Sequence, residues 1–434
     1  MRCVSTRGEA PSASIDAALQ AGLAADGGLY VPDHIPALIA PPAHDSNLAE
    51  TASTVLAPYF IESALHDTLP ALCRQAFDFP APLRALHGAG DHLLELFHGP
   101  TAAFKDYAAR FLARALQALR PADAPPVTIV VATSGDTGAA VAAAFHRLPG
   151  FAVAILYPDG RVSQRQAHGL ECWDDNVRTF RVAGSFDDCQ RMAKQLLADA
   201  DLRERLALGS ANSISLGRLL PQIAYHAHAA WRFHRAHDQP LNLIVPTGNL
   251  GNACAAWLAR RMGAPIGRIV LATNANAVLP RFLAGGDYLP QPAIATLANA
   301  MDVGDPSNVE RLRHWHGGDD AALRSDLQAM SVDDATIRRV ITDAPRQHGI
   351  IPCPHTACGL FVLQQLRTSG DQLPWAVAAT AHPAKFADTV EPLLGQSIAV
   401  PAALQQCLAR PRRYEQLPAE TAALRDALLH GRVQ

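Results

Sequence analysis

Three times in this chain a run of consecutive apolar residues ends in a loop of small and polar residues, and a helical pattern follows. Residues 127–132 fit a strand, with a helix from about 137 to 147 and another strand at 151–157. The order recurs with a strand at 241–245, a helix from about 252 to 262 and a strand at 268–273, and a third apolar strand ends near Ala379. Strands that are apolar throughout are buried on both faces, so this alternation predicts an α/β fold with two doubly wound parallel sheets.

The length of 434 residues is too great for one ordinary core. We expect three units. The first is a helical, proline-punctuated N-terminal domain over 1–85. The second is a large α/β domain made of 86–110 and 226–434, and the third is a small α/β domain over 111–225 inserted into it. The tail beyond about residue 400 carries no motif that we can interpret.

Composition restricts the partners and the location. The formal net charge is −3, so small molecules are better expected partners than nucleic acid or an anionic membrane surface. The start "MRCVSTRGEAPSASIDAALQ" has no apolar signal-peptide core, and no stretch reaches about 18 uninterrupted apolar residues, which predicts a cytoplasmic location.

The eight cysteines include no C-x-x-C pair and are expected to be reduced, mostly buried thiols. The histidines of "YHAHAAWRFHRAH" lack metal-site spacing, so we expect no metal.

Lysine is rare in this chain. Of its 37 basic residues, all but Lys105, Lys194 and Lys385 are arginines. A primary amine can lose its proton and attack a carbonyl, whereas a guanidinium stays charged. Lys194 lies in an amphipathic helical pattern and fits its solvated face. Lys105 of "GPTAAFKDY" and Lys385 of "HPAKF" are therefore candidates for chemistry, although Lys385 also fits a surface position.

The loop "PTGNLGN" follows the strand at 241–245. Gly248 and Gly251 let the backbone approach an anion, and Asn249 and Asn252 can donate hydrogen bonds. The helix that follows adds free N–H groups and the positive end of its dipole. The spacing is neither that of the dinucleotide fingerprint nor that of the P-loop. The loop predicts a phosphate site, with an ordinary turn as the alternative.

Two further loops follow predicted strands. In "ATSGDTGAA", Ser134 and Thr137 offer hydroxyls and Gly135 gives close backbone access, which suits a substrate carboxylate. The alternative is that Asp136 only caps the helix. In "TAHPAK", Thr380 places a hydroxyl at the end of a strand. An amine that can form a Schiff base, a phosphate site, a carboxylate site and such a hydroxyl are together what pyridoxal phosphate requires.

The chain also resembles the threonine synthase family, in the branch with an extra N-terminal domain. The matching stretches include "STRGEAPS", "DGGLYVP", "ELFHGPTAAFKDYAARFL", "SANSISLGRLLPQIAYH", "MDVGDPSNVERL", "PHTACG" and "TAHPAKF", and they run from about residue 5 to 390. Tyr107 and Leu250 replace the usual residues of two family motifs and keep a bulky side chain at each. The resemblance implies a fold-type-II, tryptophan synthase β-like architecture with pyridoxal 5'-phosphate bound to Lys105.

The resemblance also implies the roles of other residues. It places the cofactor phosphate on the loop Gly248, Asn249, Leu250, Gly251 and Asn252, and the cofactor ring nitrogen on Thr380. It places the substrate carboxylate on Ser134, Gly135, Asp136 and Thr137. The implied substrate is O-phospho-L-homoserine, converted with water to L-threonine and phosphate. Our candidates for its phosphate are Asn212, Ser213, Arg218 and Lys385, with His382 and Asp106 as weaker ones.

Three alternatives remain at this stage. A serine or threonine dehydratase-like lyase would share the cofactor site, but would not need "SANSISLGR" or "HPAKF". A synthase-like protein without activity would only bind ligand. A nicotinamide-dependent oxidoreductase would share the fold pattern, but its fingerprint is missing. We expect a monomer or a homodimer.

Overall fold

The computed structural model describes residues 1–38, 40–88 and 90–431. Its N-terminal part contains a small antiparallel sheet in the order β2-β1-β3. The strands and helices of this part are β1 (Arg2–Ser5), β2 (Ala13–Ser14), α1 (Ile15–Ala21), β3 (Tyr30–Pro32), α2 (Leu48–Leu56) and α3 (Leu69–Ala76). The sequence predicted a helical region and missed this sheet, because strands of two to four residues are too short to show a period.

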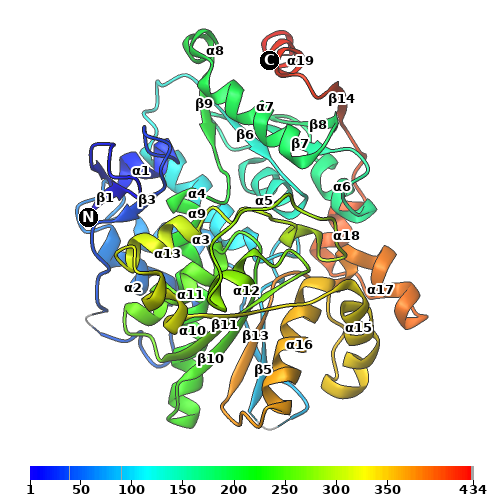
Figure 1. Ribbon diagram of the computed structural model, residues 1–434. Coiled ribbons are helices and arrows are strands. Elements are labelled where there is room, and N and C mark those ends of the chain that lie inside the picture. The colour runs from blue at the N-terminus through cyan, green and yellow to red at the C-terminus, as the bar shows by residue number, and fades with distance from the viewer. Residues whose placement is uncertain (39, 89, 432–434) are drawn as a thin grey trace.

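The larger parallel sheet lies below the smaller one in Figure 1. In spatial order its strands are β12 (Gln328–Ser331), β11 (Ile266–Thr273), β10 (Leu241–Pro246), β13 (Trp375–Ala379), β5 (Asp91–Glu95) and β4 (Leu83–Ala85). Only β4 pairs in the antiparallel sense. Because β4 joins this sheet, the expected boundary at residue 85 lies a few residues too late.

The central strands β10 and β13 of the large sheet are buried on both faces, as predicted, whereas the edge strands β4 and β12 are partly exposed. In β10, Leu243 and Val245 join the core formed with helices α10 (Ile223–His237) and α11 (Gly251–Arg261). Ile244 points the other way, into the core formed with α15 (Asp334–His348) and α16 (Pro354–Thr368). A pleated strand sends successive side chains to opposite faces, so an apolar residue at every position requires helices on both.

The smaller sheet is parallel throughout. In spatial order its strands are β14 (Glu415–Pro418), β8 (Val177–Ala183), β7 (Phe151–Pro158), β6 (Val127–Ala132) and β9 (Ala207–Ser210). Helices α5 (Asp136–Phe145) and α6 (Gln164–Glu171) contribute to the core on one face, and α7 (Phe186–Ala198) and α19 (Thr421–His430) to the core on the other. Lys194 is exposed on α7, as its amphipathic pattern predicted.

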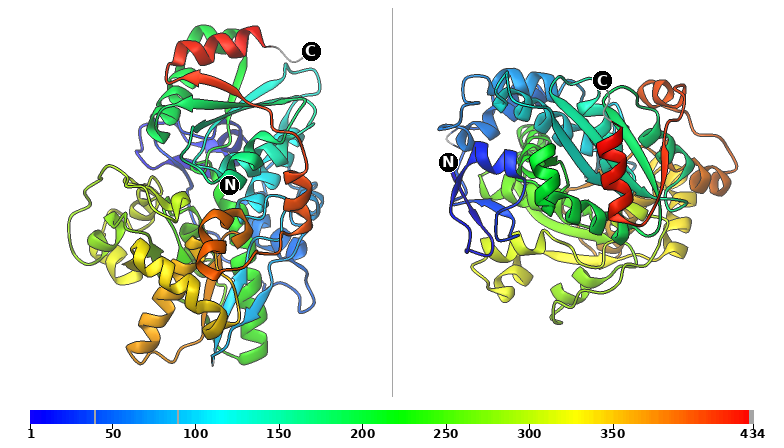
Figure 2. Two further views of the ribbon diagram at one scale, coloured as in Figure 1. Left: turned by 90° about the vertical axis from the view of Figure 1, so that its right-hand side faces the viewer. Right: turned by 90° about the horizontal axis from the view of Figure 1, so that it is seen from above.

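The C-terminal segment differs from the expected division of the chain. We expected 226–434 to lie wholly in the large unit, but β14 pairs with β8 of the small sheet and α19 packs on α7. Figures 1 and 2 show this segment, in red, on top of the small unit. Covering the edge of β8 satisfies backbone groups that would otherwise be exposed. The sequence carried no signal for this, because a short edge strand has no distinctive pattern.

Helix α4 (Lys105–Leu119) runs from the large unit toward the small one and contacts α3 and α5. The loops that follow β6, β10 and β13 lie in the region between the two sheets. No helix of the described residues is long and apolar enough to cross a membrane. All eight cysteines are buried and none forms a disulfide, although the sulfur atoms of Cys172 and Cys407 lie 2.8 Å apart.

A buried carboxylate fastens the C-terminal segment to the small unit. Glu171 is fully buried and accepts hydrogen bonds from Arg181 at 2.6 Å and Arg412 at 2.5 Å. Burial raises its pKa, but these arginines and Tyr157 lower the pKa further, so it lies below its ordinary value. Its stabilising contribution is therefore present at neutral pH and is lost as the pH falls below about 4.

We predict that Glu171→Gln lowers the free energy of unfolding by about 3 kcal/mol at pH 7, because Arg181 loses its counter-charge in a buried site. Urea unfolding followed by tryptophan fluorescence measures this change. Glu415→Gln is the matched control, since its side chain is 45% exposed in its pair with Arg178, and it should change stability by less than about 1 kcal/mol. Equal effects of the two substitutions would contradict the assignment.

Candidate active site

Lys105 is the first residue of α4 and is held at the end of strand β13. Ala103 forms an antiparallel bridge with Ala381. The N–H of Phe104 donates to the carbonyl of Thr380 at 2.9 Å, and the N–H of His382 donates to the carbonyl of Ala102 at 3.0 Å. The segment before α4 is thus fixed on the segment after β13. This pairing places Lys105 beside Thr380, as the combination of motifs predicted.

The turn before Lys105 is closed by Asp106. The N–H and hydroxyl of Thr101 donate to the two carboxyl oxygens of Asp106, at 2.8 and 2.5 Å. A Cβ on Gly99 would lie 2.5 Å from that carboxyl group, so only glycine fits there. Burial raises the pKa of Asp106 to about 6, against the opposing effect of the Thr101 hydrogen bonds. Asp106 is therefore engaged within the turn, and its weak candidacy as a substrate ligand finds no support.

The surroundings of Lys105 lower the pKa of its amine, which favours nucleophilic chemistry. Burial lowers its pKa to about 8, the Asp136 carboxylate opposes this shift, and the positive charges of Arg218 and Lys385 add to it. A lysine with this pKa is half unprotonated near pH 8, whereas an ordinary lysine is almost fully protonated there. Unprotonated amine is the form that attacks a carbonyl.

The loop Gly248–Asn252 joins β10 to α11, and its shape depends on glycine. A Cβ on Gly248 would lie 2.7 Å from the Cα of Met301, which leaves room only for glycine. Leu250 has a positive φ of 62° and donates its N–H to the hydroxyl of Thr247 at 3.1 Å. The first turn of α11 has no side-chain cap. Its free N–H groups suit an anion such as a phosphate.

The two asparagines of this loop are held by neighbours. Asn249 donates from Nδ2 to the hydroxyl of Ser213 at 3.2 Å. Asn252 accepts a 2.6 Å hydrogen bond at Oδ1 from Nε2 of His226, whose pKa burial lowers to about 4, so the imidazole is neutral. The Nδ2 of Asn252 is buried and has no partner among the described residues. An unused buried donor beside a free helix N-terminus fits the phosphate of pyridoxal phosphate.

The turn Ser134–Thr137 joins β6 to α5 in the small unit. The hydroxyl of Thr133 accepts hydrogen bonds from the N–H groups of Gly135 and Gly138, at 3.0 and 2.9 Å. Gly135 has a φ of 129°, and α5 has no side-chain cap. Asp136 does not cap the helix. This turn leaves backbone donors of the first helical turn free for an anion.

Asp136 pairs with Lys385 across the space between the two units. Lys385, in the turn η4 (Pro383–Phe386), places Nζ 2.7 Å from Oδ1 of Asp136 and donates to the carbonyl of Thr101 at 2.8 Å. Both side chains are almost fully buried. Burial raises the pKa of Asp136, but Lys385 and Lys105 hold it well below its usual range. Lys385 is thus not the surface lysine that the sequence left open.

Arg218 is a buried cation that forms no ion pair with a described residue, although the charge of Asp106 acts on it from a distance. It lies in α9 (Leu216–Leu219), is 2% exposed and donates from Nη1 to the carbonyl of Ala211 at 2.7 Å. Its Nε has no partner in the described part of the chain. Burial lowers its pKa to about 10, so it stays charged at neutral pH. Burying an unpaired guanidinium is costly, which indicates that an anion belongs there.

Sequence reasoning missed three polar residues around this cluster. His355 begins α16 within the "PHTACG" stretch, and burial lowers its pKa to about 4. Gln166 of α6 donates to Asp136, and Asn299 donates to Gln166. The "PHTACG" stretch was a usable signal for His355. The stretch "LYPDGRVSQRQ", which also resembles the family, ends at Gln166 and was a usable signal for it. Asn299 carried none, because amides of this kind are common on surfaces.

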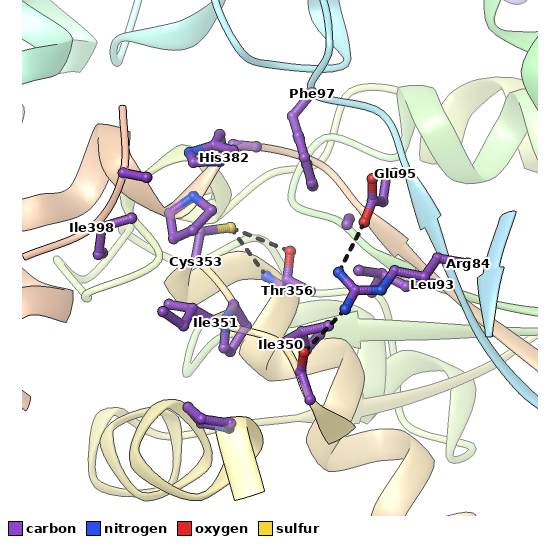
Figure 3. Close-up of a pocket in the computed structure, with 17 residues that line it drawn as sticks. Arg84, Leu93, Glu95, Phe97, Ile350, Ile351, Cys353, Thr356, His382 and Ile398 are labelled. Carbon is purple, nitrogen blue, oxygen red and sulfur yellow. Dashed lines mark hydrogen bonds and ion pairs between the residues drawn. The ribbon is translucent and has the colours of Figure 1, made fainter. Parts of the chain in front are cut away.

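A cavity of about 530 Å³ lies between the ends of β5 and β13 and the start of α16, and Figure 3 shows the residues that line it. Its lining includes Glu95, Phe97, Cys353, Thr356 and His382. It contains neither Lys105 nor any residue of the two glycine loops. His382 therefore faces a different space from the cluster around Lys105, which weakens its candidacy as a ligand of the substrate phosphate.

Comparisons with known proteins agree with this site. Residues 79–382 match the sequence profile described as "Pyridoxal-phosphate dependent enzyme". Residues 2–77 match "Threonine synthase N terminus", and residues 356–428 match "Threonine synthase, C-terminal". Threonine synthase from Haemophilus influenzae is 39% identical over 422 residues, which covers 95% of this chain and 96% of the relative.

Two solved structures extend the comparison to the fold. The crystal structure of threonine synthase from Escherichia coli superimposes with a TM-score of 0.89 at 36% identity, covering 99% of this chain and 100% of that one. The structure of PLP-bound threonine synthase from Brucella melitensis gives 0.90 at 34% identity, with 99% of each chain covered. The fold and the site are thus those of a fold-type-II, pyridoxal-phosphate-dependent enzyme. Within that class, the chain belongs to the threonine synthase family.

We predict that Gly248→Ala weakens the binding of pyridoxal phosphate at least tenfold, because the added methyl group must displace the backbone of Met301. Titration of the apoenzyme with cofactor, followed by visible absorption, measures this. Gly169→Ala in α6 is the control, since its Cβ would make an ordinary 3.8 Å contact with Ala139. Unchanged affinity in Gly248→Ala would contradict the shape of the loop described above.

We also predict a pH dependence for cofactor capture. The rate at which the apoenzyme takes up pyridoxal phosphate should rise with pH, with a midpoint near the Lys105 pKa of about 8. Asp136 raises that pKa, so Asp136→Asn should move the midpoint to lower pH, whereas Asp187→Asn, on the exposed face of α7, should not. Stopped-flow absorption measures this uptake rate at pH values between about 6.5 and 9.5, in steps of about half a pH unit. A midpoint unmoved in Asp136→Asn would refute the coupling.

Proposed function

We propose that this enzyme converts O-phospho-L-homoserine and water to L-threonine and inorganic phosphate. The observation that carries the proposal is an excess of buried positive charge. The positive charges of Arg218 and Lys385 act on Lys105, and only two buried carboxylates, Asp136 and Asp106, lie among these three cations in the described chain. A site of this kind suits a ligand with several negative charges. A phosphorylated amino acid bound beside a phosphorylated cofactor meets that description.

The residues present fit pyridoxal phosphate. The uncapped α11 and the free donor of Asn252 support binding of its phosphate by Gly248, Asn249, Leu250, Gly251 and Asn252. Thr380, next to the segment that carries Lys105, would face its ring nitrogen. When bound, the cofactor supplies an aldehyde for amines and an electron sink for a carbanion at Cα.

We assign the substrate carboxylate to the turn Ser134–Thr137. The free N–H groups at the start of α5 and the hydroxyls of Ser134 and Thr137 are suitable donors. The side chain of Asp136 is not, because it is ionised and would repel a carboxylate. Its contribution is to hold Lys385. This proposal keeps the turn Ser134–Thr137 that the resemblance implied as the carboxylate site, and gives the Asp136 side chain a different role.

The substrate phosphate would bind Arg218, with Asn212, Ser213 and Lys385 as further donors. Arg218 is charged and unpaired within the described chain, and Ser213 already contacts Asn249 of the phosphate loop. Lys385 uses two of its three N–H donors on Asp136 and Thr101, which leaves one for the substrate. Charge-assisted bonds of this kind stabilise the departing phosphate.

Lys105 is the residue best suited to move protons. As a free amine, Lys105 would be able to accept the Cα proton and return it, because burial and neighbouring cations lower its pKa to about 8. Gln166, Asp136 and Lys385 enclose this space with buried polar groups. The conversion balances if Cβ loses a proton as the Cγ–O bond breaks and phosphate leaves, and if water then adds its hydroxyl at Cβ while Cγ gains a proton.

The geometry favours the synthase over a dehydratase-like lyase. A dehydratase substrate has a carboxylate and a hydroxyl but no phosphate, and would leave Arg218 without an ion-pair partner. We propose a monomer or a homodimer. Eight buried cysteines, none of them in a disulfide, support a reducing compartment, and we propose a cytoplasmic location.

The decisive experiment incubates the holoenzyme with O-phospho-L-homoserine and measures phosphate and L-threonine together. We expect equimolar products from the wild type and none from Lys105→Ala. Arg218→Met should lower kcat/KM roughly a hundredfold, equivalent to about 3 kcal/mol for a lost charge-assisted contact. If the wild type instead releases ammonia and 2-oxobutanoate from L-threonine, and no phosphate from O-phospho-L-homoserine, the dehydratase alternative is correct.

A further inference from the structure

One short segment of the large unit contacts the phosphate loop directly and reaches the turn Ser134–Thr137 through Gln166. This is the turn η3 (Asn299–Met301). Met301 lies against Gly248 of the phosphate loop, where a Cβ would come within 2.7 Å of its Cα. Ala300 donates its N–H to Nε2 of His355 at 3.1 Å. Asn299 donates from Nδ2 to Oε1 of Gln166, at 2.9 Å, in the small unit.

Gln166 in turn lies directly against the turn Ser134–Thr137. Its side chain is buried and donates from Nε2 to Oδ1 of Asp136 at 3.2 Å. A Cβ on Gly135 would lie 2.9 Å from the same Nε2, so the amide and the turn are in close contact. Its Oε1 also accepts the N–H of Ser163, at 3.2 Å, which fixes the amide at the start of α6. Each polar atom of the Gln166 amide therefore has a defined partner.

A chain of polar contacts thus crosses between the units twice. It runs from Asn299 in the large unit to Gln166 and Asp136 in the small unit, and back to Lys385 in the large unit. The titratable groups near it are Asp136, Lys385, Lys105 and His355. In a buried network, removal of one member leaves its neighbours with unsatisfied groups, so the members act together.

We propose that Gln166 is a positioning residue for substrate binding. Through Asn299 it aligns the carboxylate turn of the small unit with the phosphate loop of the large unit, and through Asp136 it orients Lys385. This inference rests on the proposed function, because it concerns the same substrate site. Gln166 touches none of Lys105, Thr380 or Gly248–Asn252 through a hydrogen bond, so its loss affects the substrate rather than the cofactor.

The test compares Gln166→Met with the wild-type holoenzyme. Methionine keeps the length of the side chain and removes both hydrogen-bonding groups. We expect KM for O-phospho-L-homoserine to rise about tenfold, with kcat within about threefold and with the cofactor absorption and affinity unchanged. Gln164→Met is the matched control, because Gln164 is exposed two positions earlier, and it should leave KM unchanged.

Two further variants separate positioning from simple structural support. Asn299→Leu should raise KM similarly. The KM of the double variant should be no higher than that of the single variant with the higher KM, because the two residues act through one contact.

Gln166→Glu keeps the acceptor for Asn299 but places a second negative charge beside ionised Asp136. Its KM, relative to the wild type, should improve from pH 8 to pH 6, as the carboxyl group gains a proton that it can donate.

The outcomes are distinct. Additive effects of Gln166→Met and Asn299→Leu, an unchanged KM, or a parallel loss of cofactor affinity would overturn the positioning role. If the wild type releases no phosphate from O-phospho-L-homoserine, the proposed function fails instead. Binding of L-threonine, followed by the visible absorption of the cofactor, then tests the positioning on its own. Gln166→Met should weaken that binding about tenfold, and equal binding would refute the role.

Discussion

The site depends on one short backbone pairing. Ala103 and Ala381 form a bridge, flanked by the hydrogen bonds from Phe104 to Thr380 and from His382 to Ala102. This pairing brings the start of α4 to the end of β13, although the two segments are far apart in the sequence. It therefore determines the position of Lys105 relative to Thr380, and α4 then carries the chain into the small unit. Backbone contacts hold such a geometry more rigidly than side chains do.

Around this pairing, burial and charge oppose one another. Burial alone would neutralise Lys105 and Asp136, since it disfavours the charged form of each. Their mutual attraction and the contact of Asp136 with Lys385 act against burial, so Asp136 stays ionised while the pKa of Lys105 falls to about 8. Arg218 adds a charge that forms no ion pair with a described carboxylate, and its Nε has no hydrogen-bond partner in the described part of the chain. The result is a site that favours anions, in which the pKa of the Lys105 amine lies close to neutral pH.

Much of this could be predicted from the sequence. The apolar strands at 127–132 and 241–245, the glycine-containing loops after them and the rarity of lysine indicated the fold and the cofactor site, and the comparisons support the cofactor and the family. Other features could not be predicted. The small N-terminal sheet and β14 are too short to show a period, and the pairing of Asp136 with Lys385 joins residues 249 positions apart in the sequence through a contact that no local pattern encodes.

By itself the sequence determined the local structures, because strand burial, helix starts and glycine-dependent turns follow from side chains near one another along the chain. It therefore determined the loops at Gly248–Asn252 and Ser134–Thr137 and the presence of a single suitable lysine before α4. Only the tertiary structure decided which of these groups face one another. It directed Asp136 toward Lys385 rather than toward a ligand, placed His382 in a separate cavity and joined the two loops through Gln166 and Asn299. Those outcomes depend on the packing of two sheets against each other, and such packing is set by the whole core rather than by any one segment.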